Sequence, residues 1–131
     1  MHGVTDYSMA RRAVLEGYRV GTVARADICD AQPELLRAAI HQGEQLRAPC
    51  PVCESESAVR VTFAFGERLA KRNGRLIGTT EIASYLDLEG VRCYSVEVCT
   101  ACAWNHIMRA YVGRNPETDS TASYGDPPRA D

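Results

Sequence analysis

Two pairs of cysteines constrain this chain more than any other feature of its sequence. The pairs are Cys50-Pro51-Val52-Cys53 and Cys99-Thr100-Ala101-Cys102, with residues 54–98 between them. A tight turn across each pair aims both sulfurs at one ion, and the backbone N–H groups of the turn stabilise the thiolates. Four soft sulfur ligands form the tetrahedral set that zinc prefers. We therefore predict one structural zinc ion (Zn2+), bound by Cys50, Cys53, Cys99 and Cys102.

Other uses of these cysteines fit the sequence less well. Iron in a rubredoxin-like site would have the same four ligands and stays open as an alternative. Two disulfides would need an oxidising compartment, and a thioredoxin-like redox pair would need a βαβ context; the sequence supports neither. Glycine often follows the second cysteine of a zinc knuckle, because a left-handed turn is favoured there. Glu54 and Ala103 occupy these two positions, so slightly strained knuckles are expected.

Cys29, Cys93 and His106 lie outside the pairs. We interpret Cys29 and Cys93 as small buried apolar residues, which is a common role of free cysteine. A redox-sensing thiol is the alternative, although nothing nearby in the sequence would activate it. His106 follows Cys102 by four residues, but four cysteines already complete the metal's coordination. We therefore expect His106 at the surface or beside the ligands.

Helical periodicity marks the first third of the chain. Residues 5–20 are predicted to form an amphipathic helix with Thr5 as its N-cap, and residues 31–42 a second helix capped by Asp30. The segment 22–29 between them is predicted to be a short connector. The pattern therefore predicts an N-terminal pair of helices.

From Pro49 onward the pattern changes to strands. Residues 58–65 and 91–98 alternate between apolar and polar side chains, which is typical of half-buried strands. Residues 80–88 are predicted to form a short helix, and the ambiguous segment 103–112 is expected to be a strand. Each cysteine pair thus meets a strand, which is the layout of a zinc ribbon. The fold class that follows is α+β, with the helical pair packed on a four-cysteine zinc ribbon that has a small antiparallel sheet.

Length and charge set the domain organisation. The chain has 131 residues, 45% of them hydrophobic, and a net charge of −2. We predict a helical region over residues 1–48 and a zinc-ribbon region over 49–113, packed as one compact unit, followed by a disordered acidic tail over 114–131. No apolar run is long enough to span a membrane and the start lacks a secretory signal, so a cytoplasmic location and no membrane partner are expected.

Three stretches of sequence read together resemble a known family. They are residues 27–39, residues 50–53 and residues 96–106, the last with the pattern Cys-x-x-Cys-x-Trp-Asn-His. They resemble a family of small actinobacterial proteins described as a domain of unknown function, and the likeness covers roughly residues 5–113. Gln32 departs from the pattern, because His or Asn is expected there. The resemblance implies a cytoplasmic zinc-ribbon-like protein and supplies no activity.

A catalytic role is not expected. A catalytic zinc keeps one coordination position open, whereas four cysteines close the site. The chain also shows no Ser-His-Asp order, no glycine-rich phosphate loop and no paired-carboxylate motif. We therefore expect a binding protein rather than an enzyme.

A cluster of basic residues offers a contact surface. The turn residues Asn73-Gly74 predict a two-residue hairpin turn. The basic patch around it consists of Arg68, Lys71, Arg72 and Arg75. It is either a solvated turn or a contact to phosphate or to an acidic protein surface.

Together these features favour an accessory protein. We expect it to dock on a large gene-expression assembly such as RNA polymerase or the ribosome, with a protein as the main partner and nucleic acid as a secondary one. Because the net charge is −2, coating of nucleic acid is excluded. The alternative is a DNA-binding transcriptional regulator that uses residues 22–42 as a helix-turn-helix.

Overall fold

The structure is a computed structural model, and it describes residues 3–113. The tail expected over residues 114–131 lies outside the described residues. Within residues 3–113, no helix is long and apolar enough to cross a membrane. Helices and strands both occur, so the α+β class predicted from the sequence is confirmed.

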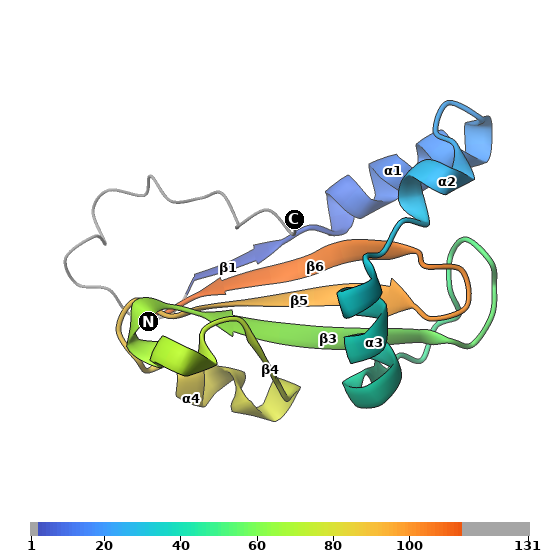
Figure 1. Cartoon of the computed structure of the whole chain (residues 1–131). Helices are drawn as coiled ribbons and strands as arrows, with labels where there is room; N and C mark the ends of the chain where they lie inside the picture. The colour runs from blue at the N-terminus through green and yellow to red at the C-terminus, as the bar shows by residue number, and fades with distance from the viewer. Residues whose placement is uncertain (1–2, 114–131) are drawn as a thin grey trace.

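One antiparallel sheet of six strands organises the described residues (Figure 1). Its strands follow the order β1-β6-β5-β3-β2, and β4 also pairs with β3. They are β1 (Gly3–Asp6), β2 (Glu44–Gln45), β3 (Ala58–Phe65), β4 (Arg75–Ile77), β5 (Arg92–Cys99) and β6 (Asn105–Val112). The strand expected over residues 103–112 is therefore confirmed.

Within residues 3–113, four α-helices and two short 3-10 segments surround the sheet. The helices are α1 (Ser8–Val20), α2 (Arg25–Ile28), α3 (Pro33–Gln42) and α4 (Ile82–Leu86). The 3-10 segments are η1 (Glu67–Arg72) and η2 (Thr79–Glu81). Figure 1 shows α3 crossing the sheet at β3 and β5, α4 near the opposite end of these strands, and α1 with α2 beyond β6.

Side chains that alternate along β3 and β5 divide the core between the two faces of the sheet. On one face, Val61 and Val98 pack with Ala39 of α3 and with the neighbouring apolar residues of that helix. On the other face, Ala58 and Ala64 belong to two separate apolar clusters. Because both faces of β5 are covered, this strand is buried along most of its length.

The two clusters of the second face lie at opposite ends of β3. One surrounds Trp104 at the end where β3 begins, and the other joins Ala64 to α4 at the end where β3 finishes. A polar strip separates them. Thr62 and Ser95 are hydrogen-bonded there through their hydroxyls at 2.9 Å. Among the described residues, three core regions therefore hold the sheet, and one of these three contains cysteines of the predicted zinc site.

A buried ion pair ties α1 to the polar strip. The Glu97 side chain is 5% exposed, and its carboxylate accepts hydrogen bonds from Arg11 Nε at 2.7 Å and from Arg11 Nη2 at 3.2 Å. A carboxylate with two partners in this geometry keeps its charge satisfied away from water. Arg11 thereby fixes the position of α1 over β5.

Two predicted helix caps are wrong. Thr5 lies in β1, and α1 begins at Ser8, whose backbone N–H donates to Asp6 Oδ1 at 2.7 Å. Asp30 does not cap α3, because its carboxylate instead accepts a hydrogen bond from Asn105 Nδ2 at 3.0 Å. Gln32 occupies the N-cap position and makes no side-chain cap bond.

The two-residue turn predicted at Asn73-Gly74 is also wrong. Residues 66–74 connect β3 to β4, and η1 occupies most of this connection. Leu69 explains the longer path, because its side chain is buried in the cluster that contains Ala64. Asn73 Oδ1 accepts the N–H of Gly66 at 2.9 Å and so closes the base of the loop.

Candidate metal centre

The four cysteines predicted as ligands come together at one end of the sheet. Their sulfur atoms all lie within 4.8 Å of one another. Cys50 Sγ lies 3.7 Å from Cys102 Sγ, and Cys53 Sγ lies 3.6 Å from Cys99 Sγ. Sulfurs bound to zinc at ~2.3 Å in a tetrahedron would be about 3.8 Å apart. The donor set and its spacing therefore fit one zinc ion.

Two matching turns and one strand pair bring the ligands together. The N–H of Glu54 donates to the carbonyl of Cys50, and the N–H of Ala103 donates to the carbonyl of Cys99, each at 2.9 Å. The first turn precedes β3, and the second joins β5 to β6. Because Ala58 is paired with Cys99 in the sheet, the long segment between the cysteine pairs is closed by strand pairing.

In both turns, the residue that follows the second cysteine has a left-handed backbone conformation. Glu54 has φ of 65° and Ala103 has φ of 72°. A side chain in this region clashes with the following carbonyl, which costs roughly 1–2 kcal/mol per residue. The left-handed backbone expected from the sequence at Glu54 and Ala103 is confirmed.

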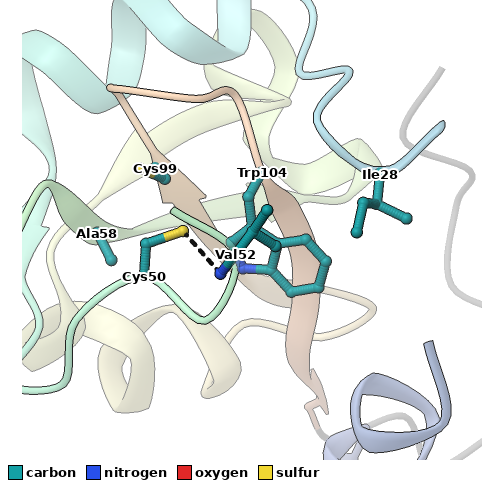
Figure 2. Packing of buried hydrophobic residues seen from close by; sticks show 6 residues of the cluster. All are labelled: Ile28, Cys50, Val52, Ala58, Cys99 and Trp104. Carbon is teal, nitrogen blue, oxygen red and sulfur yellow. Dashed lines mark hydrogen bonds between the residues drawn. The ribbon is translucent and has the colours of Figure 1, made fainter. Parts of the chain in front are cut away.

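Backbone N–H groups point at the ligand sulfurs. Cys50 Sγ accepts from the N–H of Val52 at 3.3 Å, drawn in Figure 2, and from the N–H of Cys53 at 3.5 Å. Cys102 accepts a backbone hydrogen bond from Trp104. Such bonds stabilise negative charge on sulfur, so the turns are suited to thiolate ligands.

The thiols of the metal-free site differ in acidity. Hydrogen bonds from the side chain and backbone of Ser55 lower the pKa of Cys53 to about 6. Burial raises the pKa of Cys50 and of Cys102 above the usual thiol value. At neutral pH, a metal ion would therefore have to displace protons from Cys50 and Cys102.

An apolar wall encloses the inner side of the site. Figure 2 shows the Trp104 ring beside Val52, with Ile28 on its other side. Trp104 is 0% exposed. His106 stacks on it at a ring-centroid distance of 5.9 Å, and its Nδ1 lies 2.7 Å from the Ile107 carbonyl oxygen. His106 is thus beside the ligand-bearing turn, as expected, and outside the group of four cysteines.

Cys29 is a feature of the site that the sequence interpretation missed. Its sulfur lies 3.6 Å from Cys102 Sγ, and it is half-buried rather than fully buried. The exposed Arg25 guanidinium hydrogen-bonds the Cys29 side chain, which raises the pKa of Arg25. Cys93 differs, because it is fully buried in the cluster around Ala64, as predicted, and burial raises its pKa to about 11.

Contacts between α2–α3 and the second turn explain where Cys29 lies. The N–H of Ala31 donates to the carbonyl of Ala103 at 3.0 Å, and Asn105 donates to Asp30. Two stretches of the family-like pattern, residues 27–39 and 96–106, therefore touch in space. Their appearance in one pattern was the only signal in the sequence that pointed to this contact.

The basic patch is not part of the cysteine site. Arg68, Lys71 and Arg72 are on η1, Arg75 begins β4, and all four are exposed. Arg68 Nη1 forms a long ion pair with Glu89 at 3.8 Å. The loop that carries the patch follows the end of β3, whereas the cysteines lie where β3 begins. The structure therefore separates the two predicted sites by the length of this strand.

Comparison with known proteins places this chain in a family. Residues 1–125 match a family of unknown function, DUF5318. The chain belongs to the DUF5318 family. Relatives include uncharacterized proteins of Mycobacterium tuberculosis (Rv0049) and Mycobacterium bovis (Mb0050), each 38% identical over 112 residues, which is 82% of this chain and 79% of the relative. No solved structure matches the chain. The DUF5318 assignment and the mycobacterial relatives agree with the expected actinobacterial family.

Proposed function

We propose that this DUF5318 protein is a non-catalytic zinc-binding accessory protein that docks on a large gene-expression assembly, such as RNA polymerase or the ribosome. The observation that carries the zinc site is the gathering of four cysteine sulfurs within 4.8 Å of one another. Four cysteine thiolates in two hydrogen-bonded turns are a ligand set that structural zinc uses. Iron would accept the same four ligands and is the alternative metal.

The ligand set favours a structural role for the metal. Four protein ligands leave no position for water or substrate, which a catalytic zinc requires. The ligands also join distant parts of the chain, because one pair precedes β3 and the other begins at the last residue of β5. Binding of the metal would therefore stabilise the fold at this end of the sheet.

The basic patch supports docking on an acidic or phosphate-bearing surface. Arg68, Lys71 and Arg72 are exposed on the connection between β3 and β4, and Arg75 is exposed where β4 begins. Four cations gathered on a chain of net charge −2 suit an auxiliary contact within a larger interface. We choose a gene-expression assembly because zinc ribbons are common in such assemblies. The main partner is proposed to be a protein.

A DNA-binding regulator remains the alternative proposal. Residues 22–42 would form its helix-turn-helix, with α3 as the reading helix. Glu34, Arg37 and His41 are exposed on α3 and Gln32 is exposed at its N-cap, as direct readout would require. However, α2 has only four residues and the exposed side of α3 carries a single arginine. These features favour the docking proposal.

Metal analysis tests the zinc site. The purified protein is expected to contain one zinc per chain, and Cys99→Ser is expected to lower both zinc content and melting temperature. Cys93→Ala is the matched control, since Cys93 is a buried cysteine outside the group of four. A protein that folds normally without any bound metal would refute the metal site. One iron per chain in place of zinc would show that iron, the alternative metal, occupies the site.

Binding to purified assemblies tests the docking proposal. Ribosomes and core RNA polymerase from an actinobacterium are incubated with the protein and separated by sedimentation or gel filtration. The double change Arg72→Glu with Arg75→Glu is expected to weaken capture about tenfold, and most strongly at low salt. Arg12→Glu with Arg37→Glu is the control, because it reverses the same charge at exposed sites elsewhere. Sequence-specific DNA binding without capture by either assembly would favour the regulator.

A further inference from the structure

Cys29 lies close enough to a proposed metal ligand to react with it. Its Sγ is 3.6 Å from Cys102 Sγ, yet Cys29 is outside the group of four sulfurs that fit the metal. The two cysteines are 73 positions apart in the sequence and meet only through folding. Closing this sulfur–sulfur gap to the bond length of a disulfide, ~2.05 Å, requires movement of about 1.5 Å.

The surrounding residues keep Cys29 at this place. Ile28 is buried against Trp104 (Figure 2), and this contact anchors the end of α2 immediately before Cys29. The N–H of Cys29 donates to the carbonyl of Arg25 at 2.9 Å. These contacts fix the backbone on the N-terminal side of Cys29, and the Cys29 sulfur is thereby held beside Cys102.

Cys29 is also reachable from solvent. It is half-buried, and its side chain hydrogen-bonds the exposed Arg25 guanidinium. The four proposed ligands would be shielded by the metal, whereas Cys29 would keep a free thiol.

From this geometry we infer that Cys29 and Cys102 form a peroxide-reactive pair, whose disulfide removes one ligand and releases the metal. The inference rests on the zinc site of the proposed function. It assigns an oxidative modification site to Cys29, the more accessible of the two thiols that the zinc site does not use.

The reaction balances with hydrogen peroxide as the oxidant. Peroxide transfers one oxygen to the Cys29 sulfur, giving a sulfenic acid and one water. The Cys102 sulfur then attacks the Cys29 sulfur, forms the S–S bond and expels hydroxide, which takes up a proton to become the second water. Two electrons pass from the two sulfurs to peroxide, and the charge of the zinc ion does not change.

Zinc release and disulfide mapping test the inference together. Zinc-loaded protein is treated with hydrogen peroxide, released zinc is followed with a colorimetric chelator, and peptides are mapped by mass spectrometry without reduction. The wild-type chain is expected to form a Cys29–Cys102 disulfide as zinc is released, and to recover zinc binding after reduction. Cys29→Ser is expected to slow release about tenfold or more. Cys93→Ala is the control and is expected to behave like the wild type.

Two results would overturn the inference. One is equally fast zinc release from Cys29→Ser, and the other is a first disulfide that joins two of the four ligands instead. The map uses the wild-type chain, so it decides the matter even if Cys29→Ser does not fold. If the purified protein contains no zinc, the proposed function fails by itself, and the mapped disulfide still decides whether Cys29 and Cys102 react.

Discussion

Ala103 shows how a single residue limits the stability of the cysteine site. Its φ of 72° places a Cβ in the left-handed region, at a cost of roughly 1–2 kcal/mol. Glycine would remove that strain but lose about 0.4–1 kcal/mol through the greater freedom of the unfolded chain. We therefore expect Ala103→Gly to raise the free energy of unfolding by about 0.5–1 kcal/mol, measured by urea denaturation of the zinc-loaded protein.

A control for this change lies in the same turn. Ala101 is exposed and its φ is not positive, so Ala101→Gly only adds freedom to the unfolded chain. It is expected to lower stability by about 0.4–1 kcal/mol. Equal losses from both glycine substitutions would show that the left-handed backbone at Ala103 carries no strain.

The acidity of the individual thiols sets the pH dependence of metal binding. Burial raises the pKa of Cys50 and Cys102, so both are protonated in the metal-free protein between pH 7 and pH 8, whereas Cys53, with a pKa of about 6, is mostly ionised. Zinc binds thiolates, and it must therefore release at least two protons. The zinc affinity is expected to rise at least about 100-fold from pH 7 to pH 8, that is, tenfold for each proton released.

Competition with a chelator of known affinity at the two pH values measures this slope. Cys93→Ala should give the same slope, because the Cys93 thiol lies outside the group of four. An affinity that does not change with pH would show that the four cysteines are already thiolates, or that they are not the ligands.

At the scale of elements, a largely buried ion pair joins α1 to β5. Arg11→Met would leave the Glu97 carboxylate buried without its partner, and breaking a buried pair costs roughly 3–5 kcal/mol. Because Arg11 is one-third exposed, a loss of about 2 kcal/mol is expected. Adding Glu97→Gln removes the unpaired charge and should recover at least half of this loss in denaturation experiments.

Arg19 offers a matched control on the same helix. It pairs with Glu16 on the exposed surface of α1, where an ion pair contributes little. Arg19→Met is expected to leave the melting temperature unchanged. If Arg11→Met and Arg19→Met lower the melting temperature by similar amounts, the effect comes from replacing an arginine in α1. It would then not come from loss of the pair with Glu97.

How much of each element could be predicted depends on how its side chains are buried. The strands predicted over residues 58–65 and 91–98 correspond to β3 and to β5, which covers Arg92–Cys99. Both could be predicted because their alternation is set by two faces of one sheet, and this alternation is visible in the sequence. The edge strand β1 was missed because all four of its residues are exposed and carry no such pattern. Asn73-Gly74 predicts a two-residue turn, but the connection between β3 and β4 covers residues 66–74. Its path depends on the burial of Leu69, which is a tertiary contact.

The candidate site divides in the same way. The four ligands could be predicted because the spacing within each pair is local and chemically specific. Cys29 could not, because its contact with Cys102 depends on how α2 packs against the turn between β5 and β6. Contacts between elements distant in the sequence leave no local pattern.

At the scale of the whole molecule, the sheet carries separate core regions at its two ends. The cluster around Trp104 contains Cys50 and Cys99, whereas the cluster around Ala64 and α4 contains none of the four ligands. The polar strip with Thr62 and Ser95 lies between them. A protein built this way can lose order at one end while keeping it at the other.

We therefore expect removal of zinc to loosen the described residues at one end only. In hydrogen exchange measured by mass spectrometry, amides near the ligands, such as those of Glu54 and Ala103, should lose protection in zinc-free protein. Amides at the end of β3 and in α4 should keep theirs, because their partners lie in the other cluster. Ile82→Val, a loss of about 0.5–1.5 kcal/mol in that cluster, is the control and should weaken α4 while zinc stays bound. Uniform loss of protection in zinc-free protein would contradict the separation of the two ends, because it would mean that the metal holds the whole sheet as one cooperative unit.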